Sequence, residues 1–539
     1  MKVYMNKADK IVIVGGGSSG WMAATQLNKF FPKKEIVCIE SKDIPRVGVG
    51  ESTVEHFSAW VKSVGIETRD MFIHTDATYK LSIKFNDFYK KGDGGFQYPF
   101  GLANADSKIF GEMGLDAWQY MKLLDPSIPN DDYARTYFPS VALCDHNTIN
   151  FNNNREFDNV FNFYHSHAYH FDAIKFANFL RDKIAVPRGV KYIPATVEEV
   201  NMNDRGIESV TLDSGEIIEG DLFLDCTGFK SLLLSKLDPE WLDYSHIIPN
   251  NRAWACRVPY TDIRKQMDIY TNCTALGNGW VWNTPTRERI GTGYVYSDKY
   301  TTPEAALKEF QEHLEAKGYN THELKFREVH MRVGMYREIW KKNCVAIGLS
   351  AGFVEPLEST GLFTTVGFIQ RLTETLHQTD SYHQWQINEY NAMTRGDYDG
   401  LAKFTASHYM FTQRTDTQYW RDCIDREYNI SIVPTDISMP ETQSSDDYWV
   451  QQVLKKNCYS YSYDNEGGIH CIMAGMNSNP LNRQTAWRRG YYRTGPTPKE
   501  LSYKLPNIKE LADRRKKHWD DQAALSESHY DYLRRTYWS

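Results

Sequence analysis

The protein contains 539 residues, of which 41% are hydrophobic and 24% are charged, a balance that is typical of a globular fold. The net charge of −7 speaks against a nucleic-acid partner, and no run of about 18 apolar residues is present that would cross a membrane. The apolar run at the N-terminus is too short for a signal peptide. We therefore expect a cytoplasmic protein with one large core or two to three domains.

Nine cysteines are scattered along the chain without a C-x-x-C pair. An odd number without paired spacing is typical of reduced and mostly buried thiols, and it supplies no zinc site. We expect no metal centre.

A dinucleotide site is predicted near the N-terminus. The β-branched run KIVIV at 10–14 precedes GGGSSG, and the helical stretch WMAATQLNKFF follows, so a glycine turn joins a strand to a helix. This context fits G-x-G-x-x-G, in which a pyrophosphate approaches backbone amides at a helix N-terminus. The next strand ends on an acid twenty residues after the last glycine, where a ribose-binding carboxylate belongs. The residues assigned to this site are Gly15, Gly17, Ser18, Gly20 and Glu40.

The later segments favour FAD over NAD. A second glycine-rich turn, VGVGEST, occupies residues 47–53, and the strand GDLFLDCTGF (220–229) closes on Thr-Gly. Between them, residues 197–221 alternate like a small β-meander, and NCVAIGLSAGF (343–353) gives another strand and turn. No second G-x-G-x-x-G lies in a strand–helix frame, so reducing equivalents are expected from another protein.

The stretch FVEPLESTGLF (353–363) has two interpretations. It reads as a helix start, with Ser359 or Thr360 as the cap and the acids near the positive end of the helix dipole. It also places Glu355 and Glu358 between a predicted strand and a predicted helix, where their carboxylates could serve in catalysis. Taken alone, the stretch favours the helix start.

The motifs together resemble one family. GGGSSGWMAA, VGVGEST, TYKLSIKF, AYHFDA, DCTGF, WVWNTP, GTGYVYS and FVEPLESTG occur in the order seen in flavin-dependent halogenases of the tryptophan-halogenase type, from about residue 10 to about residue 420. A viral member of the family fits this pattern as well as a bacterial one. The resemblance implies that a separate flavin reductase delivers reduced FAD, and that O2 and the flavin oxidise a halide to hypohalous acid. The further flavin contacts it implies are Gly48, Gly50, Glu51, Ser52, Thr53, Val197, Leu349 and Leu362.

The same resemblance assigns the catalytic residues. In the family the oxidant reaches a lysine beside the aromatic substrate, and the matching position is Lys80. Glu358 matches the acid that works beside this lysine, and the backbone amides of Thr360 and Gly361 match the halide site. Glu355 is interpreted as structural. Without the resemblance, Lys80 would be read as one more solvated lysine.

Two tryptophans form another marker. Trp280 and Trp282 match the family string W-x-W-x-I-P, except that Thr284 replaces the isoleucine. In the family these side chains line the region between flavin and substrate. Period-two spacing also predicts two core residues on one face of a strand.

The substrate residues match the family less well. The expected pocket contains Tyr98, Pro99, Phe100, Trp280 and Trp282. Tyr98 replaces a histidine of the tryptophan-specific members, and residues 453–476 do not align with their amino-acid clamp. In that segment Tyr459, Tyr461 and Tyr463 either line a pocket or are surface strand residues, and the second interpretation is favoured. We therefore expect an indole or phenol rather than free tryptophan as the dedicated substrate, with chloride, bromide or iodide all open.

The expected fold class is α/β: an FAD-binding box with a Rossmann-like parallel sheet and a second β-sheet, capped by a largely helical substrate domain. Residues 1–370 would form the box, with pocket segments inserted at about 70–165 and 240–300, and residues 371–539 a cap packed on it. Helices are predicted at 304–318, 361–378 and 498–538, the last divided at Pro506, with a loop at 430–447. A homo-oligomer is one option.

Two other functions compete with halogenation. A flavin monooxygenase on this scaffold would hydroxylate an aromatic ring, but that chemistry needs neither Lys80 nor Glu358. A flavin-binding protein without turnover would have no reason to keep this lysine–acid pair. An oxygenated product formed without halide would support the first, and flavin binding without a product would support the second.

Overall fold

A computed structural model of the chain describes residues 6–44, 46, 48, 50–101, 118, 121–122, 125–151, 161–379, 381–426, 467–477 and 498–539. The predicted loop at 430–447 and the tyrosines 459, 461 and 463 lie outside these ranges. Eight cysteines fall inside them, and all eight are free and buried, as the sequence predicted.

The Rossmann-like parallel sheet is present. Strand β2 (Lys10–Val14), helix α1 (Ser18–Phe30) and strand β3 (Glu35–Ile39) form the predicted strand–turn–helix–strand unit. The sheet has the order β10-β3-β2-β14-β23-β22, in which only β22 pairs antiparallel with its neighbour. Its other strands are β10 (Lys191–Ile193), β14 (Leu222–Asp225), β23 (Cys344–Ala346) and β22 (Trp340–Lys341). The carboxyl ends of the parallel strands therefore meet at one edge of the sheet.

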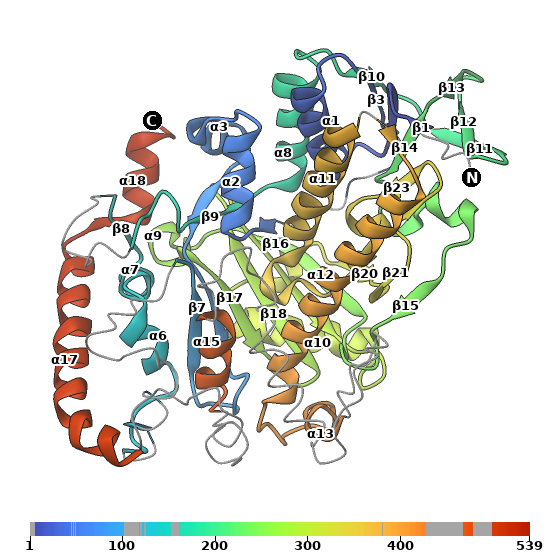
Figure 1. Cartoon of the computed structure of the whole chain (residues 1–539). Coiled ribbons are helices and arrows are strands. Elements are labelled where there is room, and N and C mark those ends of the chain that lie inside the picture. The colour runs from blue at the N-terminus through green and yellow to red at the C-terminus, as the bar shows by residue number, and fades with distance from the viewer. Residues whose placement is uncertain are drawn as a thin grey trace.

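The predicted meander is also confirmed. Strands β11 (Val197–Asn203), β12 (Gly206–Leu212) and β13 (Ile217–Glu219) pair antiparallel in chain order. It lies beside the parallel sheet, close to the N-terminus (Figure 1).

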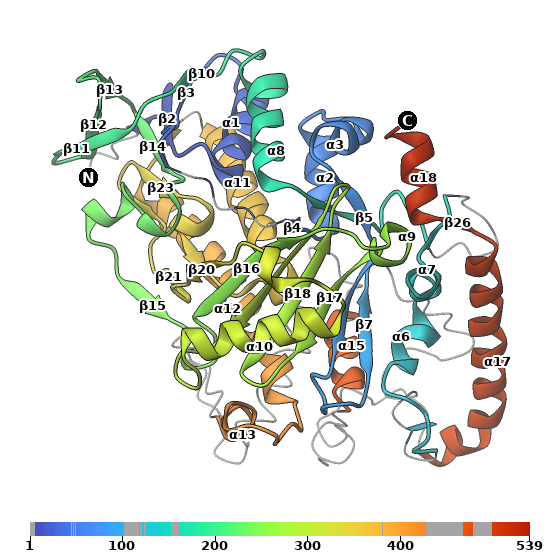
Figure 2. The same cartoon turned by 180° about the vertical axis from the view of Figure 1, so that it is seen from behind.

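A second, larger sheet unites the two expected pocket segments. Its order is β20-β16-β19-β18-β17-β6-β7, antiparallel except for the parallel pair β17·β6. Helix α10 (Pro303–Ala316) lies across one face of this sheet (Figure 2). The strands are β6 (Ser82–Asn86), β7 (Gly95–Pro99), β16 (Arg252–Val258), β17 (Tyr270–Ala275), β18 (Gly279–Pro285), β19 (Ile290–Tyr296) and β20 (Arg327–His330).

Long helices connect the two sheets. Helix α11 (Thr360–Thr379) packs on α1, and α12 (Gln384–Met410) packs on α11 (Figure 1). Helices α13 (Gln418–Asp425) and α15 (Gly467–Gly475) follow, and α15 lies against β7. The contacts of α12 with α11 and β22 support the proposal that residues after 370 cap the box.

The C-terminal segment forms two helices, as predicted, but the break between them is not at the predicted residue. Helix α17 (Pro498–Ala524) continues through Pro506, so the break expected there is wrong. A proline removes one backbone donor, which the other turns of this long helix can bear, and Pro506 is exposed. The helix instead ends before β26 (Glu527–Ser528), which pairs with β8 (Thr148–Ile149), and α18 (His529–Thr536) follows.

The remaining elements are short. A three-stranded sheet of β4 (Glu51–Ser52), β9 (Ala168–Phe171) and β5 (Thr78–Lys80) joins the second glycine turn to the predicted lysine. The other small sheets are β15 (Trp241–Asp243) with β21 (Gly334–Tyr336) and β24 (Gly352–Phe353), and β1 (Asn6–Lys7) with β25 (Ser381–Tyr382). The short helices are α2 (Glu55–Ser63), α3 (Thr68–His74), α6 (Asp132–Tyr137), α7 (Ser140–His146), α8 (Ala173–Phe179) and α9 (Ile263–Gln266).

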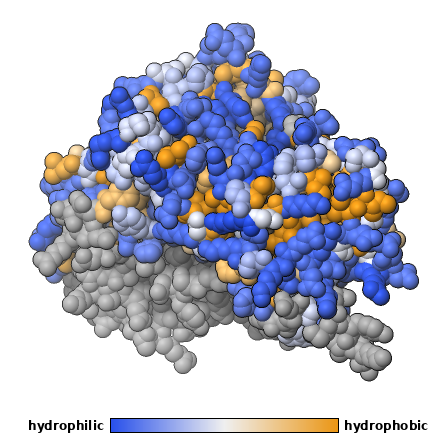
Figure 3. Space-filling model, turned by 90° about the horizontal axis from the view of Figure 1, so that it is seen from above, coloured by the Kyte–Doolittle hydropathy of each residue, from blue (hydrophilic) through white to orange (hydrophobic). Residues whose placement is uncertain are grey.

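One face of the molecule shows how polar and apolar residues are distributed on it. The face shown in Figure 3 is mostly hydrophilic, with hydrophobic residues gathered in limited areas between the charged ones. None of the helices that the structure describes is both long enough and apolar enough to cross a membrane.

Candidate active site

The glycine turn after β2 is shaped by close backbone approaches. Gly15 has φ +113°, and its N–H donates to the Ile39 carbonyl at 2.9 Å. A Cβ at Gly15 would overlap the Cys226 carbonyl, and a Cβ at Gly20 would overlap the Gly15 carbonyl. Beside Gly17, which precedes α1, a Cβ would meet no atom within 4 Å. The turn thus leaves open space at the positive end of α1, next to Ser18, the first residue of the helix.

Glu40 is held beside this turn. The carboxylate is buried, lies over Gly16, and accepts hydrogen bonds from Arg46 and, at 3.3 Å, from Trp21 Nε1. The Arg181 guanidinium lies 3.4 Å from Glu40 Oε2, the oxygen that Trp21 also contacts. These contacts fix the acid at the carboxyl end of β3, where a ribose hydroxyl can reach it.

The second glycine turn leads into strand β4. Gly50 has φ +123°, and Gly48 packs near Ala173. Thr53 is fully buried and exchanges hydrogen bonds of 2.9 Å with the Tyr169 backbone. Burial, with the nearby Asp172 charge, raises the pKa of Glu51 to about 7.

Lys80 lies at the end of β5 and has no exposed surface. Its Nζ donates to the Thr53 carbonyl at 2.9 Å and to Ser359 Oγ at 2.8 Å, and it lies 4.9 Å from the centre of the Phe100 ring. Burial lowers the pKa of Lys80 to about 7, although the nearby charge of Glu358 opposes this change. The amine therefore changes protonation state near neutral pH, unlike a solvated lysine.

Glu358 is buried near Lys80. It ends the 3₁₀ turn Pro356–Glu358, and Ser359 follows in the left-handed region with φ +59°. Burial raises the pKa of Glu358, while His408 and Lys80 act in the opposite direction. His408 Nε2 lies 2.8 Å from Glu358 Oε1. The acid is thus more basic than a solvated carboxylate and has a histidine in contact.

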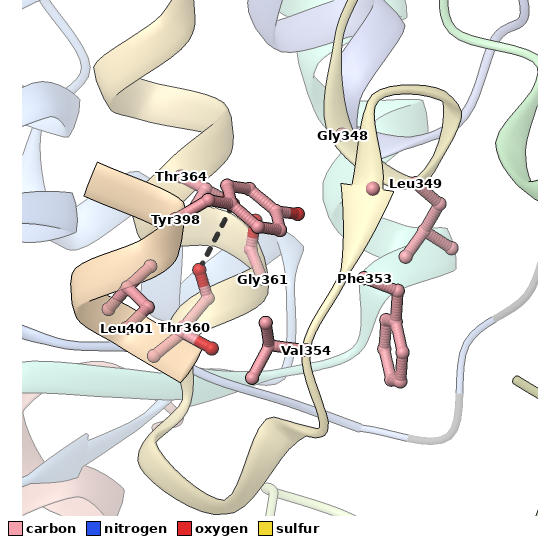
Figure 4. Close-up of a pocket in the computed structure, with 10 residues that line it drawn as sticks. Gly348, Leu349, Phe353, Val354, Thr360, Gly361, Thr364, Tyr398 and Leu401 are labelled. Carbon is pink, nitrogen blue, oxygen red and sulfur yellow. Dashed lines mark hydrogen bonds between the residues drawn. The ribbon is translucent and has the colours of Figure 1, made fainter. Parts of the chain in front are cut away.

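A small cavity lies at the start of α11. Thr360 and Gly361 line it together with Leu349, Phe353 and Val354, and their arrangement is shown in Figure 4. A Cβ at Gly361 would meet no atom within 4 Å. The first amides of a helix have no partner within that helix, so this end of α11 suits an anion. Leu362 is buried directly after this turn.

The predicted aromatic residues lie on β18 and at the end of β7, and of these Phe100 contacts Lys80. Trp280 is fully buried, Trp282 is half-buried, and their ring centres are 6.3 Å apart on β18. Tyr98 and Trp282 pack against the hydrophobic cluster that contains Trp280 and Leu357. Pro99 ends β7 and leads into the buried Phe100, whose ring centre is 6.4 Å from that of Tyr98. Trp280 is thus a core residue, and it lies in the same hydrophobic cluster as Leu357, which precedes Glu358.

Two residues near the site have structural partners. Glu355 is buried and accepts hydrogen bonds from Asn250 Nδ2, at 2.7 Å, and from the Tyr409 hydroxyl. Thr284 lies close to Gly50: a Cβ added at Gly50 would be 3.6 Å from the methyl carbon of Thr284.

Comparison with known proteins identifies the family. Residues 10–458 match the tryptophan halogenase family model. The chain belongs to the tryptophan halogenase family. It is 35% identical to tryptophan 6-halogenase SttH of Streptomyces toxytricini over 77% of this chain and 80% of SttH. It is 31% identical to tryptophan 7-halogenase RebH of Lentzea aerocolonigenes over 88% and 90% of the two chains. The apo structure of VirX1 superposes with a TM-score of 0.86 at 33% identity, covering 99% of this chain and 100% of VirX1.

The chain is thus a flavin-dependent halogenase, and its family implies FAD as the cofactor. The residues present fit this group. Open space lies beside Gly17 at the N-terminus of α1, and the Glu40 carboxylate is fixed next to the turn. Leu349 lies after β23, at the same edge of the sheet. Val197 is half-buried and is the first residue of the meander. The preceding residue, Thr196, has its hydroxyl 2.7 Å from the hydroxyl of Ser41, which follows Glu40.

Several residues of the halogenase site carried no sequence signal. His408 lies inside α12, and Arg46 and Arg181 contact Glu40 from two other segments. Ser359 stands within the EPLEST string, yet nothing in that string predicted its bond to Lys80. Among the residues that the structure describes, no group of three or more histidine, cysteine or acidic side chains could hold a metal ion.

Proposed function

We propose that this enzyme halogenates an electron-rich aromatic ring, of the indole or phenol type, at a site between Lys80 and Glu358. The observation that supports this most directly is the environment of Lys80. Its amine is buried, titrates near neutral pH and lies over the Phe100 ring close to a buried acid. Reduced FAD, supplied by a separate flavin reductase, would provide with O2 the oxidising equivalents that turn a halide into hypohalous acid.

The halide would bind at the start of α11. Thr360 and Gly361 line the small cavity, and a Cβ at Gly361 would meet no atom within 4 Å. Backbone amides at a helix N-terminus favour a negative charge. Chloride, bromide and iodide satisfy the same requirement.

Lys80 would hold the oxidant. Two hydrogen bonds, to the Thr53 carbonyl and to Ser359 Oγ, direct the amine and leave its third N–H for the oxygen of hypohalous acid. This donor polarises the O–X bond toward the ring. Trp280 and Trp282 would keep the aromatic substrate beside Lys80 and away from the flavin.

Glu358 would accept the ring proton. The ring carbon forms a bond to X as the O–X bond breaks. The leaving oxygen takes a proton from the Lys80 ammonium group and departs as water, and the C–H proton passes to the Glu358 carboxylate. Burial raises the pKa of Glu358 and so makes it a stronger base. His408, 2.8 Å away, would hold the carboxylate in place.

The substrate is proposed to differ from free tryptophan. SttH and RebH are tryptophan halogenases. The family resemblance implies that tryptophan-specific members have a histidine and a clamp for the amino acid. In this chain Tyr98 stands where that pattern has histidine, and residues 453–476 do not align with the clamp. A ring without an amino-acid group needs no clamp, and Phe100 offers it an aromatic face.

The test is a mass-spectrometric assay of the purified protein with FAD, NADH and a flavin reductase. Indole, tryptophan and a phenol are each offered with chloride, bromide, iodide or no halide. We expect halogenated indole or phenol that requires both enzyme and halide, no product with Lys80→Met, and product with Lys84→Met. An oxygenated product without halide would show a hydroxylase instead, and faster turnover of tryptophan than of the other rings would contradict the substrate proposal.

A further inference from the structure

A chain of hydroxyl groups connects Lys80 to a buried histidine. Ser359 Oγ accepts a hydrogen bond from Lys80 Nζ at 2.8 Å and donates to Ser52 Oγ at 3.0 Å. Ser52 Oγ lies 2.6 Å from Thr271 Oγ1, which lies 2.8 Å from His170 Nε2. These residues come from segments spread over 308 positions of the chain, from Ser52 to Ser359, and four of the five are buried. Contacts of this kind are specified only by the tertiary fold.

The contact of His170 with Thr78, at the end of this row of hydroxyl groups opposite Lys80, sets the direction of the other hydrogen bonds. Thr78 Oγ1 donates to the Pro285 carbonyl at 2.7 Å, and a carbonyl can only accept. Thr78 Oγ1 then has no proton left for the 3.4 Å contact with His170 Nδ1, so we assign the donor in this contact to His170 Nδ1–H. With its proton on Nδ1, a neutral imidazole has a bare Nε2, so Thr271 must donate to it. Ser52 then donates to Thr271, and Ser359 donates to Ser52.

Burial keeps this direction constant. It lowers the pKa of His170 well below its ordinary value, and the nearby charges of Lys80 and His529 act the same way. His170 is thus neutral over the pH range in which the Lys80 amine titrates, and its Nε2 stays an acceptor. All the hydroxyl protons between them point away from Lys80, so Ser359 offers the amine a lone pair.

We propose that Ser52, Thr271 and His170 are positioning residues, which hold Ser359 as a hydrogen-bond acceptor for Lys80 and so keep the amine a donor toward the oxidant. This inference rests on the proposed role of Lys80 in halogenation. It gives a role to His170 and Thr271, neither of which is hydrogen-bonded directly to Lys80 or Glu358 in the bonds given above.

Removing the Thr271 hydroxyl from this row of hydrogen bonds should make the ammonium form of Lys80 less stable relative to the neutral amine. Without the Thr271 hydroxyl, Ser52 loses its acceptor and can donate back to Ser359, whose own proton can then turn toward Nζ. A neutral amine accepts such a bond, whereas an ammonium group cannot. Glu358 and Cys273, the other groups whose charges act on Lys80, stay in place.

The experiment compares Thr271→Val, which keeps the shape and removes the hydroxyl, with Thr271→Ser, which keeps the hydroxyl. NMR titration of protein labelled at the lysine ε-carbon reports the protonation of Lys80, and Lys80→Met identifies its signal. We expect the Lys80 inflection to move about one pH unit lower in Thr271→Val, as for loss of a hydrogen bond to a charged group, and to stay in place in Thr271→Ser. The pH profile of kcat should move in the same direction, with KM for the aromatic substrate unchanged.

The outcomes separate this inference from the proposed function. An unmoved Lys80 inflection in folded Thr271→Val overturns the positioning chain, even if the enzyme halogenates its substrates. A moved inflection supports it, even if no halogenated product forms and the proposed function fails. Should Thr271→Val not fold, Ser52→Ala interrupts the same chain one residue nearer to Lys80 and must lower the inflection, or the inference is refuted.

Discussion

Replacing Lys80 by methionine should stabilise the protein at neutral pH while it removes activity. The ordinary pKa of a lysine is 10.5, and burial lowers that of Lys80 to about 7 in the folded protein. Between these values the unfolded chain binds a proton that the folded chain releases, so the free energy of unfolding rises with pH. The destabilisation is fully present below pH 7 and is lost as the pH rises to 10.5.

The size of the effect follows from the two pKa values. At about 1.36 kcal/mol for each pH unit, the difference between 10.5 and about 7 corresponds to about 5 kcal/mol of unfolding free energy below pH 7. At pH 9 the remaining cost is about 2 kcal/mol. Loss of the hydrogen bonds to Thr53 and Ser359 changes the stability of Lys80→Met as well, but that change does not depend on pH in this way.

The assay is urea unfolding of the wild type and Lys80→Met at pH 7 and pH 9. At pH 7 the folded lysine is half-protonated and the cost is about 4 kcal/mol, so we expect the stability advantage of Lys80→Met over the wild type to shrink by about 2 kcal/mol between the two pH values. Lys84→Met, which removes a half-buried lysine from the neighbouring strand β6, controls for the loss of one positive charge. A difference between Lys80→Met and the wild type that stays constant from pH 7 to pH 9 would refute the reasoning, because it would mean that the amine is not desolvated.

Three further substitutions test the other parts of the site. Glu358→Gln removes the proposed base and should lower kcat about 10²-fold with FAD affinity unchanged; an unchanged rate in a product assay would remove Glu358 from the mechanism. Gly17→Ala adds a methyl group to open space at the start of α1, so FAD affinity measured by fluorescence titration should fall while the melting temperature stays the same. Gly361→Ala should raise KM for the halide more than KM for the aromatic substrate, and an equal rise in both would argue against a halide site there.

The parts of the fold that local sequence determines were predictable. The turn after β2 and the helix α10 depend on glycine spacing, caps and apolar periodicity within about twenty residues, and both stand where the sequence predicted them. The break expected at Pro506 is wrong because a proline weakens a helix without always ending it. Helix α17 ends at Ala524 instead, shortly before β26 pairs with the distant strand β8.

The environment of the lysine could not be predicted in the same way. Without the family resemblance, Lys80 looked like any lysine, because its burial results from Thr53, Ser359 and Phe100, which lie in three other segments. The contact of His408 with Glu358 spans 50 residues, and no motif marks the histidine. Tertiary contacts set the pKa of a buried group, so sequence patterns name the residue without its protonation state.

The stretch at 353–363 shows why the helix start and the functional site are one structure. Ser359 adopts φ +59°, a left-handed conformation that ends the 3₁₀ turn at Glu358 and lets α11 begin at Thr360. The side chain of Ser359 is hydrogen-bonded to Lys80 and Ser52, and the first residues of α11, Thr360 and Gly361, line the small cavity. One reversal of the backbone thus places the acid and the lysine's hydrogen-bond partner next to the amides proposed for the halide. If that geometry matters, Ser359→Gly, which keeps the backbone and deletes the hydroxyl, should leave KM for the halide unchanged and lower kcat, whereas a change in halide affinity alone would show that Ser359 serves the helix start and not the amine.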